Sequence, residues 1–275
     1  MKTLILGKNG FIAKSFKNYV SNEKNNFKFI SKKEINLLKK ADVKKINNYL
    51  NNYKKIIFIS AIAPAKNMDD LNANIIMISN FFNYVDFKKI SHFMYISSDA
   101  VYSDTKKTIS ESSETSPNSY HGQMHLIREN IIKNYLNKNN ICILRPTLIY
   151  GPGDTHNGYG PNLFKKLILN KEKIKLFGNG SEKRDHIHIN DVITCIYKSN
   201  SNSISGTFNV TSGEVISFKE IAVKINKKFK NQSKIISIKR TQKMPHLGYR
   251  FLSNKKIKNK LSLEFMNFDK GLNYL

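Results

Sequence analysis

Cysteine and long apolar runs are both scarce in this chain of 275 residues. Its two cysteines, Cys142 and Cys195, cannot form a disulfide framework, and their apolar surroundings predict reduced, buried thiols. The longest apolar segment, residues 56–65, is half as long as the roughly 20 residues of a membrane-spanning helix and contains Pro64. Gly7 interrupts the apolar start of the chain too early for a secretion signal. The sequence therefore predicts a cytoplasmic protein without a membrane span.

Acidic residues are also few, since 20 of them face 46 lysines and arginines and leave a net charge of +26. A basic surface attracts the phosphates of nucleic acids, nucleotides or membranes. The lysines, however, are scattered among many asparagines and isoleucines, a mixture typical of AT-rich codon usage. The composition thus disfavours nucleic-acid binding as the main role and favours attraction of an anionic small substrate. A hydrophobic content of 40% excludes a disordered polymer, a collagen and a coiled-coil rod.

The first half of the chain alternates short apolar strands with amphipathic helices. Strands are predicted at residues 2–6, 27–30, 56–59, 92–97 and 141–144. Helices are predicted at residues 11–20, 72–87 and 120–136, and a further helix, capped by Asp42, runs to about residue 50. This alternation is typical of an open, doubly wound parallel sheet, the Rossmann α/β fold, because parallel strands need crossover connections. After Tyr150 the elements become shorter. We expect a main domain over residues 1–155 and a smaller C-terminal α/β lobe over 156–275, with segments around 185–215 returning to the main domain.

A glycine-spaced loop, Gly7-Lys8-Asn9-Gly10-Phe11-Ile12-Ala13, joins the first strand to the first helix. Gly7 permits a tight turn, Gly10 lets a pyrophosphate approach the backbone, and the small Ala13 allows close packing of helix and strand. The helix then presents free N–H groups and a favourable dipole to phosphates. The pattern predicts a dinucleotide site in the main domain, and an ordinary glycine turn is the alternative. The predicted contacts are Gly7, Asn9, Gly10, Phe11 and Ile12.

The end of the second strand bears on which dinucleotide binds. A carboxylate at that point would hold the ribose hydroxyls of NAD. The strand instead ends Ile30-Ser31-Lys32-Lys33, and Glu34 comes one residue later. Because lysines accept a 2′-phosphate, the sequence favours NADP over NAD, with Ser31 and Lys32 as contacts. The alternative is that both lysines are only solvated.

Several further segments, in order, resemble the extended short-chain dehydrogenases/reductases, the NAD-dependent epimerase/dehydratase family. They are residues 60–63, Asn74, Asn80, 95–102, 144–147, 150–153, 177–180 and 184–192. The resemblance covers almost the whole chain. It implies that the main domain binds NAD or NADP, that the C-terminal lobe binds substrate, and that helices 72–87 and 120–136 form a homodimer. The further cofactor contacts that it implies are Ala61, Ala63, Asn80, Ser97, His125 and Pro146.

Members of this family bind a nucleotide-sugar and move a hydride between a sugar carbon and the nicotinamide. The resemblance therefore implies an epimerase or a ketosugar reductase. Ser98 matches the hydroxyl that hydrogen-bonds the reacting sugar oxygen, and Asp99 follows it. Ala100 stands where dehydratases place a Glu, which argues against 4,6-dehydration. The implied substrate contacts are Ser98, Asp99, Asn162, Arg184 and a second arginine, Arg250 or Arg240.

The helix at 120–136 departs from the family pattern. The family carries a Tyr that transfers the proton and, four residues later, a Lys that lowers the pKa of the Tyr and holds the nicotinamide ribose. The fourth residue after Tyr120 is Met124, which carries no charge. Counting from the flanking glycine and proline instead places the pair on His121 and His125.

The sequence favours this second register, a His-x-x-x-His pair. Residues four apart share a helix face, and an imidazole gives and takes protons near neutral pH. His121 would then be the acid/base, with His125 orienting the ribose, or Tyr120 would act with help from His125. No third ligand accompanies the pair, so no metal site is predicted. The alternative function is a non-catalytic dinucleotide-binding module, regulatory or RNA-associated.

Overall fold

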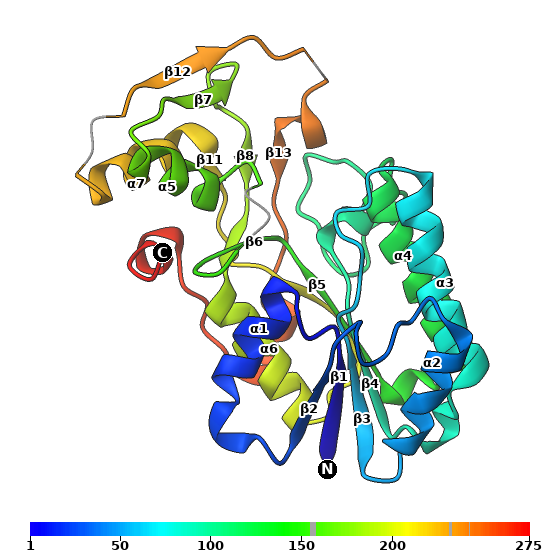
Figure 1. Cartoon of the computed structure of the whole chain (residues 1–275). Helices are drawn as coiled ribbons and strands as arrows, with labels where there is room; N and C mark the ends of the chain where they lie inside the picture. The colour runs from blue at the N-terminus through cyan, green and yellow to red at the C-terminus, as the bar shows by residue number, and fades with distance from the viewer. Residues whose placement is uncertain (155–157, 231–232, 242) are drawn as a thin grey trace. The chain divides into compact units, whose positions relative to one another are not determined.

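The computed structural model describes residues 1–154, 158–230, 233–241 and 243–275, and the chain divides into two compact units (Figure 1). Unit 1 comprises Met1–Ser103, Ser113–Pro146 and Ile193–Asn209, and unit 2 comprises Asp104–Ser112, Thr147–Val192 and Val210–Leu275. Among the described residues, no helix combines the length and the apolar content needed to cross a membrane.

Unit 1 is built on one sheet with the strand order β10-β5-β4-β3-β1-β2, in which β1 to β5 pair in parallel. Ile56, Ile57 and Phe58 are all fully buried, because a parallel sheet is covered on both faces. The predicted doubly wound Rossmann fold is confirmed. The strands are β1 (Lys2–Leu6), β2 (Phe27–Ile30), β3 (Tyr53–Phe58), β4 (His92–Ile96), β5 (Ile141–Pro146) and β10 (Gly206–Val210).

Helices cover both faces of this sheet. Figure 1 shows α2 (Lys40–Lys44), α3 (Met68–Tyr84) and α4 (Tyr120–Tyr135) over one face, and α1 (Phe11–Tyr19) and α6 (Ile189–Ser201) over the other. Local capping sets where the long helices begin. The side chain of Asn67 accepts a hydrogen bond from the Asp70 N–H at the start of α3, and Ser119 accepts one from the Gly122 N–H at the start of α4.

The predicted helix starting at Asp42 is wrong in its cap and its length. Helix α2 begins at Lys40, and the Asp42 carboxylate lies inside it, where it accepts a hydrogen bond from the Asn36 N–H at 3.2 Å. The α-helix ends at Lys44 and continues as a 3-10 turn, Lys45–Asn48. An aspartate can satisfy a loop N–H as readily as a helix terminus, so its presence alone does not fix a cap.

Unit 2 is assembled from short strands and helices around a core that includes Phe164, Phe218 and Ile221. Its sheets are β11-β8-β13, β12-β7 and β6-β9. The strands are β6 (Leu148–Tyr150), β7 (Ile174–Phe177), β8 (Lys183–Arg184), β9 (His186–His188), β11 (Ile216–Ser217), β12 (Ile235–Ile238) and β13 (Tyr249–Arg250), and the helices are α5 (Pro161–Leu169), α7 (Phe218–Lys228), α8 (Lys255–Leu261) and α9 (Phe268–Leu272).

Candidate active site

A cleft of about 210 Å³ opens at the carboxyl ends of β1, β2 and β3 in unit 1. In a doubly wound sheet, ligands bind outside this edge of the strands. The cleft is lined by the β1–α1 loop, by the segment after β2 and by the segment after β3. Its lining residues are Leu6, Gly7, Lys8, Asn9, Gly10, Ile30, Ser31, Lys32, Ile35, Asn36, Leu37, Ile59, Ser60, Ala61, Ile62 and Met77.

Gly7 is the one position in this loop where only glycine fits. Its φ is +121°, and a Cβ atom would lie 2.8 Å from the backbone nitrogen of Ser60. Gly10 has an ordinary φ of −71°, but it precedes α1 without any side-chain cap, and a Cβ there would meet nothing closer than 3.9 Å. Helix α1 therefore begins at the cleft with no side chain capping its first N–H groups, which is an arrangement that binds phosphate.

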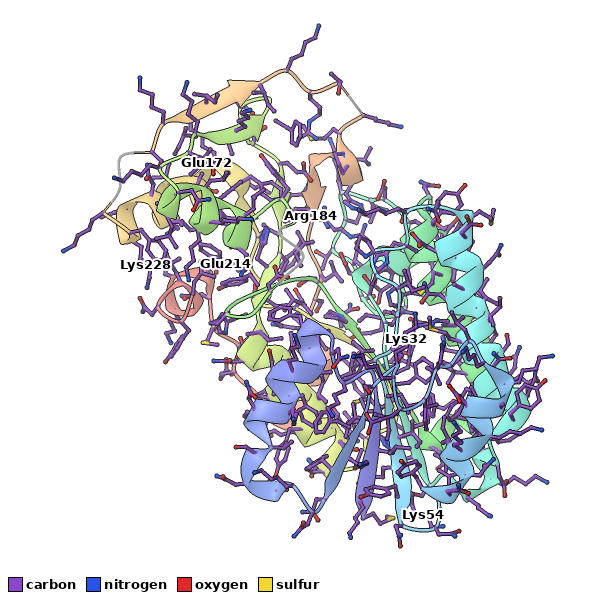
Figure 2. All side chains as sticks on the ribbon, viewed as in Figure 1. Lys32, Lys54, Glu172, Arg184, Glu214 and Lys228 are labelled. Carbon is purple, nitrogen blue, oxygen red and sulfur yellow. The ribbon has the colours of Figure 1, made fainter. Side chains whose placement is uncertain are left out.

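The loop after β2 carries both a cation and a carboxylate. Lys32, which is labelled in Figure 2, is one of the residues lining the cleft. Glu34 accepts hydrogen bonds from the Ser31 N–H and hydroxyl at 2.8 and 2.7 Å. These hydrogen bonds, the side-chain one first, hold the pKa of Glu34 below its usual value. Glu34 thus stays charged, with one of its oxygens occupied by Ser31, and Lys8 lies 4.0 Å from it.

Two asparagines of α3 hold the walls of this cleft. Asn74 exchanges hydrogen bonds with the backbone of Ile62, at 3.0 and 2.9 Å. Asn80 donates to the carbonyl oxygen of Leu37 at 2.9 Å. Of the remaining predicted cofactor contacts, Ala61 lines the cleft. Phe11 and Pro146 are buried, Ile12 is half-buried, and Ala63 is exposed.

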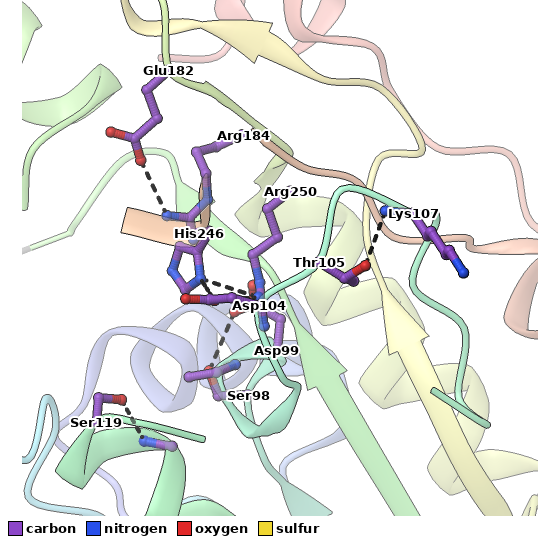
Figure 3. Close-up of polar contacts among 12 residues, drawn as sticks. Ser98, Asp99, Asp104, Thr105, Lys107, Ser119, Glu182, Arg184, His246 and Arg250 are labelled. Atoms are coloured by element: carbon purple, nitrogen blue, oxygen red, sulfur yellow. Dashed lines mark hydrogen bonds and ion pairs between the residues drawn. The ribbon is translucent and has the colours of Figure 1, made fainter. Parts of the chain in front are cut away.

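The two serines after β4 have different surroundings. Ser97 is buried and donates its hydroxyl hydrogen to Glu129 at 2.7 Å. Ser98 is only half-buried and begins a 3-10 turn, Asp99–Val101. Its Oγ accepts a hydrogen bond from the Ala100 N–H at 3.1 Å and donates to the Asp99 carboxylate at 3.5 Å (Figure 3). The hydroxyl of Ser98 is therefore the one positioned to reach a ligand.

Backbone packing brings the start of α4 against this turn. A Cβ atom at Gly122 would lie 2.2 Å from the carbonyl oxygen of Ala100, so no larger residue fits there without displacement. The contact places His121 near Asp99, whose negative charge favours the imidazolium form. Burial is the stronger effect and lowers the pKa of His121 overall, so this ring is neutral at pH 7.

His121 and His125 lie ring to ring on one face of α4. Their centroids are 4.7 Å apart at an interplanar angle of 87°. His125 is buried, and its Nδ1 lies 2.7 Å from the hydroxyl of Tyr95 on β4. Burial and, after it, repulsion from a protonated His121 and from Arg128 hold the pKa of His125 well below its usual range. Tyr120, by contrast, is 40% exposed.

Three residues that sequence reasoning did not single out complete this part of unit 1: Tyr95, Arg128 and Arg145. Arg145 donates to both oxygens of the buried Glu129 at 2.9 and 2.5 Å. Arg128 is fully buried against the cleft segment after β3. Their spacing in the sequence does not predict that they belong to this site. The only signal is that Arg128 and Glu129 follow His125 by about one helical turn.

The predicted substrate residues lie in unit 2, except Ser98 and Asp99. Asn162, at the start of α5, exchanges hydrogen bonds with the backbone of Gly151 at 3.0 and 2.7 Å. Arg184 lies 3.6 Å from Glu182. The buried Arg250 lies 3.1 Å from His246 Nδ1 and 3.5 Å from Asp104 (Figure 3). The other arginine considered, Arg240, lies 3.1 Å from Glu182.

The amino-acid sequence matches the model of the NAD dependent epimerase/dehydratase family over residues 3–211. Among solved structures, a UDP-glucose 4-epimerase from Thermus thermophilus in complex with NAD is similar with a TM-score of 0.85 and 17% identity, covering 100% of this chain and 97% of that one.

Two further structures give the same coverage of 100% and 97%. A UDP-glucuronic acid 4-epimerase from Bacillus cereus, in complex with UDP-glucuronic acid and NAD, has a TM-score of 0.83 and 20% identity. RMD from Pseudomonas aeruginosa, complexed with NADPH, has a TM-score of 0.84 and 16% identity. These likenesses show that the chain shares the fold of these proteins.

Proposed function

The chain belongs to the NAD dependent epimerase/dehydratase family, and on that premise we propose that it is an NAD(P)-dependent nucleotide-sugar epimerase or ketosugar reductase. The observation that carries the proposal is the grouping of Ser98, Asp99, His121 and His125 within the unit that also holds the glycine-loop cleft. The UDP-sugars and nicotinamide dinucleotides bound to the solved structures of this fold support the same substrate class.

The cleft fits a dinucleotide in its backbone and in its charge. Gly7 lets the chain turn beneath the pyrophosphate, and the uncapped start of α1 binds it through N–H groups. Lys32 favours a 2′-phosphate, so NADP is the preferred cofactor in this proposal, while the hydrogen-bonded Glu34 keeps NAD as the alternative. A bound nicotinamide dinucleotide supplies the chemistry of accepting a hydride from a sugar carbon and returning it.

Proton transfer falls to the residues of β4 and α4. Ser98 hydrogen-bonds the reacting sugar oxygen through its hydroxyl. His121, which is neutral at pH 7, takes the sugar proton at Nε2, because its Nδ1 is buried without a hydrogen-bond partner in the described structure. Asp99 stabilises the resulting imidazolium by its charge, and the same nitrogen returns the proton when the ketone is reduced. Tyr120 is the alternative acid/base.

Unit 2 supplies the substrate contacts of this proposal. Arg184 and Arg250 are the guanidinium groups assigned to the nucleotide diphosphate, and Asn162 is assigned to the same phosphates from the start of α5. We also infer a homodimer formed through α3 and α4. Four exposed large hydrophobic side chains lie on these helices and support it: Met68, Ile76, Tyr120 and Tyr135. Light scattering after gel filtration tests the dimer.

The function is tested with NADH and NADPH, a panel of nucleotide-4-ketosugars and UDP-sugars, and analysis of the sugar products. We expect turnover that falls by about 10²- to 10³-fold in Ser98→Ala, since one positioned hydrogen-bond donor to the reacting oxygen is lost. Ser91→Ala is the matched control, because its hydroxyl lies just before the opposite end of β4 and bonds the Lys54 carbonyl oxygen and Met1 Sδ there. Dinucleotide binding without turnover of any sugar would instead favour the non-catalytic module.

A further inference from the structure

The hydroxyl of Tyr95 determines which nitrogen of His125 carries the proton. Tyr95 is 1% exposed, and its Oη lies 2.7 Å from His125 Nδ1. The hydroxyl of Tyr95 also hydrogen-bonds the guanidinium of Arg128, which can only donate, so the Tyr95 oxygen accepts that bond and its hydrogen is left for His125. Burial raises the pKa of Tyr95 to about 12, so this hydrogen stays in place at neutral pH. Nδ1 is then the acceptor and has no proton. A neutral imidazole has one N–H, and in His125 it must therefore be at Nε2.

Arg128 places a permanent positive charge behind this pair. It is fully buried, and its guanidinium donates to the carbonyl oxygen of Asn74 at 3.0 and 2.8 Å and to that of Ser60 at 2.9 Å. Among the described residues, no carboxylate forms an ion pair with it. These carbonyl oxygens and the neutral hydroxyl of Tyr95 hydrogen-bond the guanidinium without cancelling its charge, so Arg128 opposes protonation of His125.

The other charged and titratable groups around His125 do not reverse this effect. His121, one turn earlier on α4, disfavours a second positive charge when it is itself protonated. Asp99 acts on His121, and the carboxylate of Glu129 is taken up by Arg145, Ser97 and Lys133. Tyr95 on β4 supplies a hydrogen bond but no charge. His125 is thus held in one protonation state and one tautomer.

We propose that Tyr95 and Arg128 are positioning residues that fix His125 as a neutral hydrogen-bond donor through Nε2–H. This inference rests on the proposed function, together with the prediction from the sequence that His125 orients the ribose of the bound cofactor. His125 then differs from the lysine that the family carries at this position, because it is not a cation. It orients a ligand oxygen by a directional hydrogen bond, while Arg128 supplies a positive charge from the protein interior.

Histidine NMR of the unmodified protein tests the tautomer, and one variant serves only to assign the signals. Long-range proton–nitrogen correlation spectra of ¹⁵N-histidine-labelled protein resolve the two ring nitrogens of each of the seven histidines, and the loss of one set in His125→Gln assigns His125. We expect a protonated Nε2 and an unprotonated Nδ1 at pH 7. We also expect the His125 ring to stay neutral as the pH is lowered to values at which free histidine is charged. A doubly protonated ring at pH 7, or a proton on Nδ1, overturns the proposal.

Two variants separate the two positioning residues. Tyr95→Phe keeps the ring and removes the donor, and we expect a mixture of both tautomers. Arg128→Met removes the buried charge, and we expect His125 to protonate at a higher pH than in the unmodified protein. Tyr102→Phe is the matched control, because Tyr102 is equally buried and its hydroxyl bonds Asn209 at 2.6 Å rather than a histidine. Unchanged His125 spectra in both test variants would contradict the proposal.

Kinetics then show whether the fixed tautomer is used. In Tyr95→Phe we expect kcat to fall by about 10- to 100-fold with KM for the nucleotide-sugar changed less than about twofold, and both constants within about twofold in Tyr102→Phe. Equal losses in the two variants would indicate a merely structural hydroxyl and would overturn the positioning role. If no sugar is turned over at all, the proposed function fails, while the NMR result still decides the tautomer and the charge effect by themselves.

Discussion

Arg145 on β5 and Arg128 on α4 are both buried, but only Arg145 faces a carboxylate. Arg145 donates to both oxygens of Glu129, whereas Arg128 donates to the carbonyl oxygens of Ser60 and Asn74. In the first case opposite charges cancel, and the pair ties β5 to α4. In the second case the charge remains and acts on the Tyr95–His125 pair. The same residue type therefore serves structure at one site and electrostatics at the other.

The largest effect is expected from breaking the ion pair. Glu129→Gln leaves the buried guanidinium of Arg145 without its counter-charge and also weakens the bond from Ser97. We expect a loss of about 3–5 kcal/mol in the free energy of unfolding, measured by urea denaturation. Glu172→Gln, an exposed glutamate that bonds Asn170, is the control, with a change within about 0.5 kcal/mol. A loss below about 1 kcal/mol in Glu129→Gln would show that the pair does not carry this role.

A smaller loss of stability is expected at the other arginine. Arg128→Met removes the guanidinium hydrogen bonds to the carbonyl oxygens of Ser60 and Asn74 but leaves no charge unpaired. We expect a cost of about 1–3 kcal/mol in the same urea experiment. A cost equal to or above that of Glu129→Gln would mean that Arg128 is chiefly structural, and the contrast between the two sites would disappear.

Acid should weaken the ion pair and leave Arg128 unaffected. Burial raises the pKa of Glu129, but the hydrogen bonds and charge of Arg145 outweigh it, and the net pKa lies below the usual value of 4.5. A carboxylate with a depressed folded pKa stabilises the protein above its unfolded pKa and loses that contribution as pH falls through the folded pKa. The stability difference between unmodified protein and Glu129→Gln should therefore shrink below pH 4.5. A difference that grows on acidification would contradict the assignment.

Much of this site could be predicted from the sequence because local pattern and spacing determine it. The turn at Gly7 follows from glycine spacing next to an apolar strand, and His121 and His125 share a helix face because they are four residues apart. The bond between Tyr95 and His125 joins β4 to α4, and no local pattern encodes that distance. The strand-end carbonyl groups that hold Arg128 are likewise invisible in a one-dimensional pattern.

The shortest strands of unit 2 could not be predicted from the sequence. Strands β8, β11 and β13 have two residues each, too few for a periodic pattern, and they exist only because they pair with one another.

Position in a motif also does not reveal a side chain's partner. Asn80 is predicted as a cofactor contact, and its Nδ2 donates to the carbonyl oxygen of Leu37 behind the cleft. Whether it also contacts a bound dinucleotide stays a prediction.

The smallest effect should come from Lys133, the third charged residue at the ion pair of Glu129 and Arg145. Lys133 Nζ lies 3.2 Å from the Glu129 carboxylate, but its side chain is 38% exposed, so water screens the attraction and Arg145 already neutralises the carboxylate. We expect Lys133→Met, which keeps the apolar stem, to cost less than about 0.5 kcal/mol, and the cost to vanish at high salt. Lys138→Met, beyond the end of α4, controls for loss of one surface charge. A loss above about 1 kcal/mol would mean that Arg145 alone does not compensate Glu129, and the ion pair would have to be redrawn as a three-residue network.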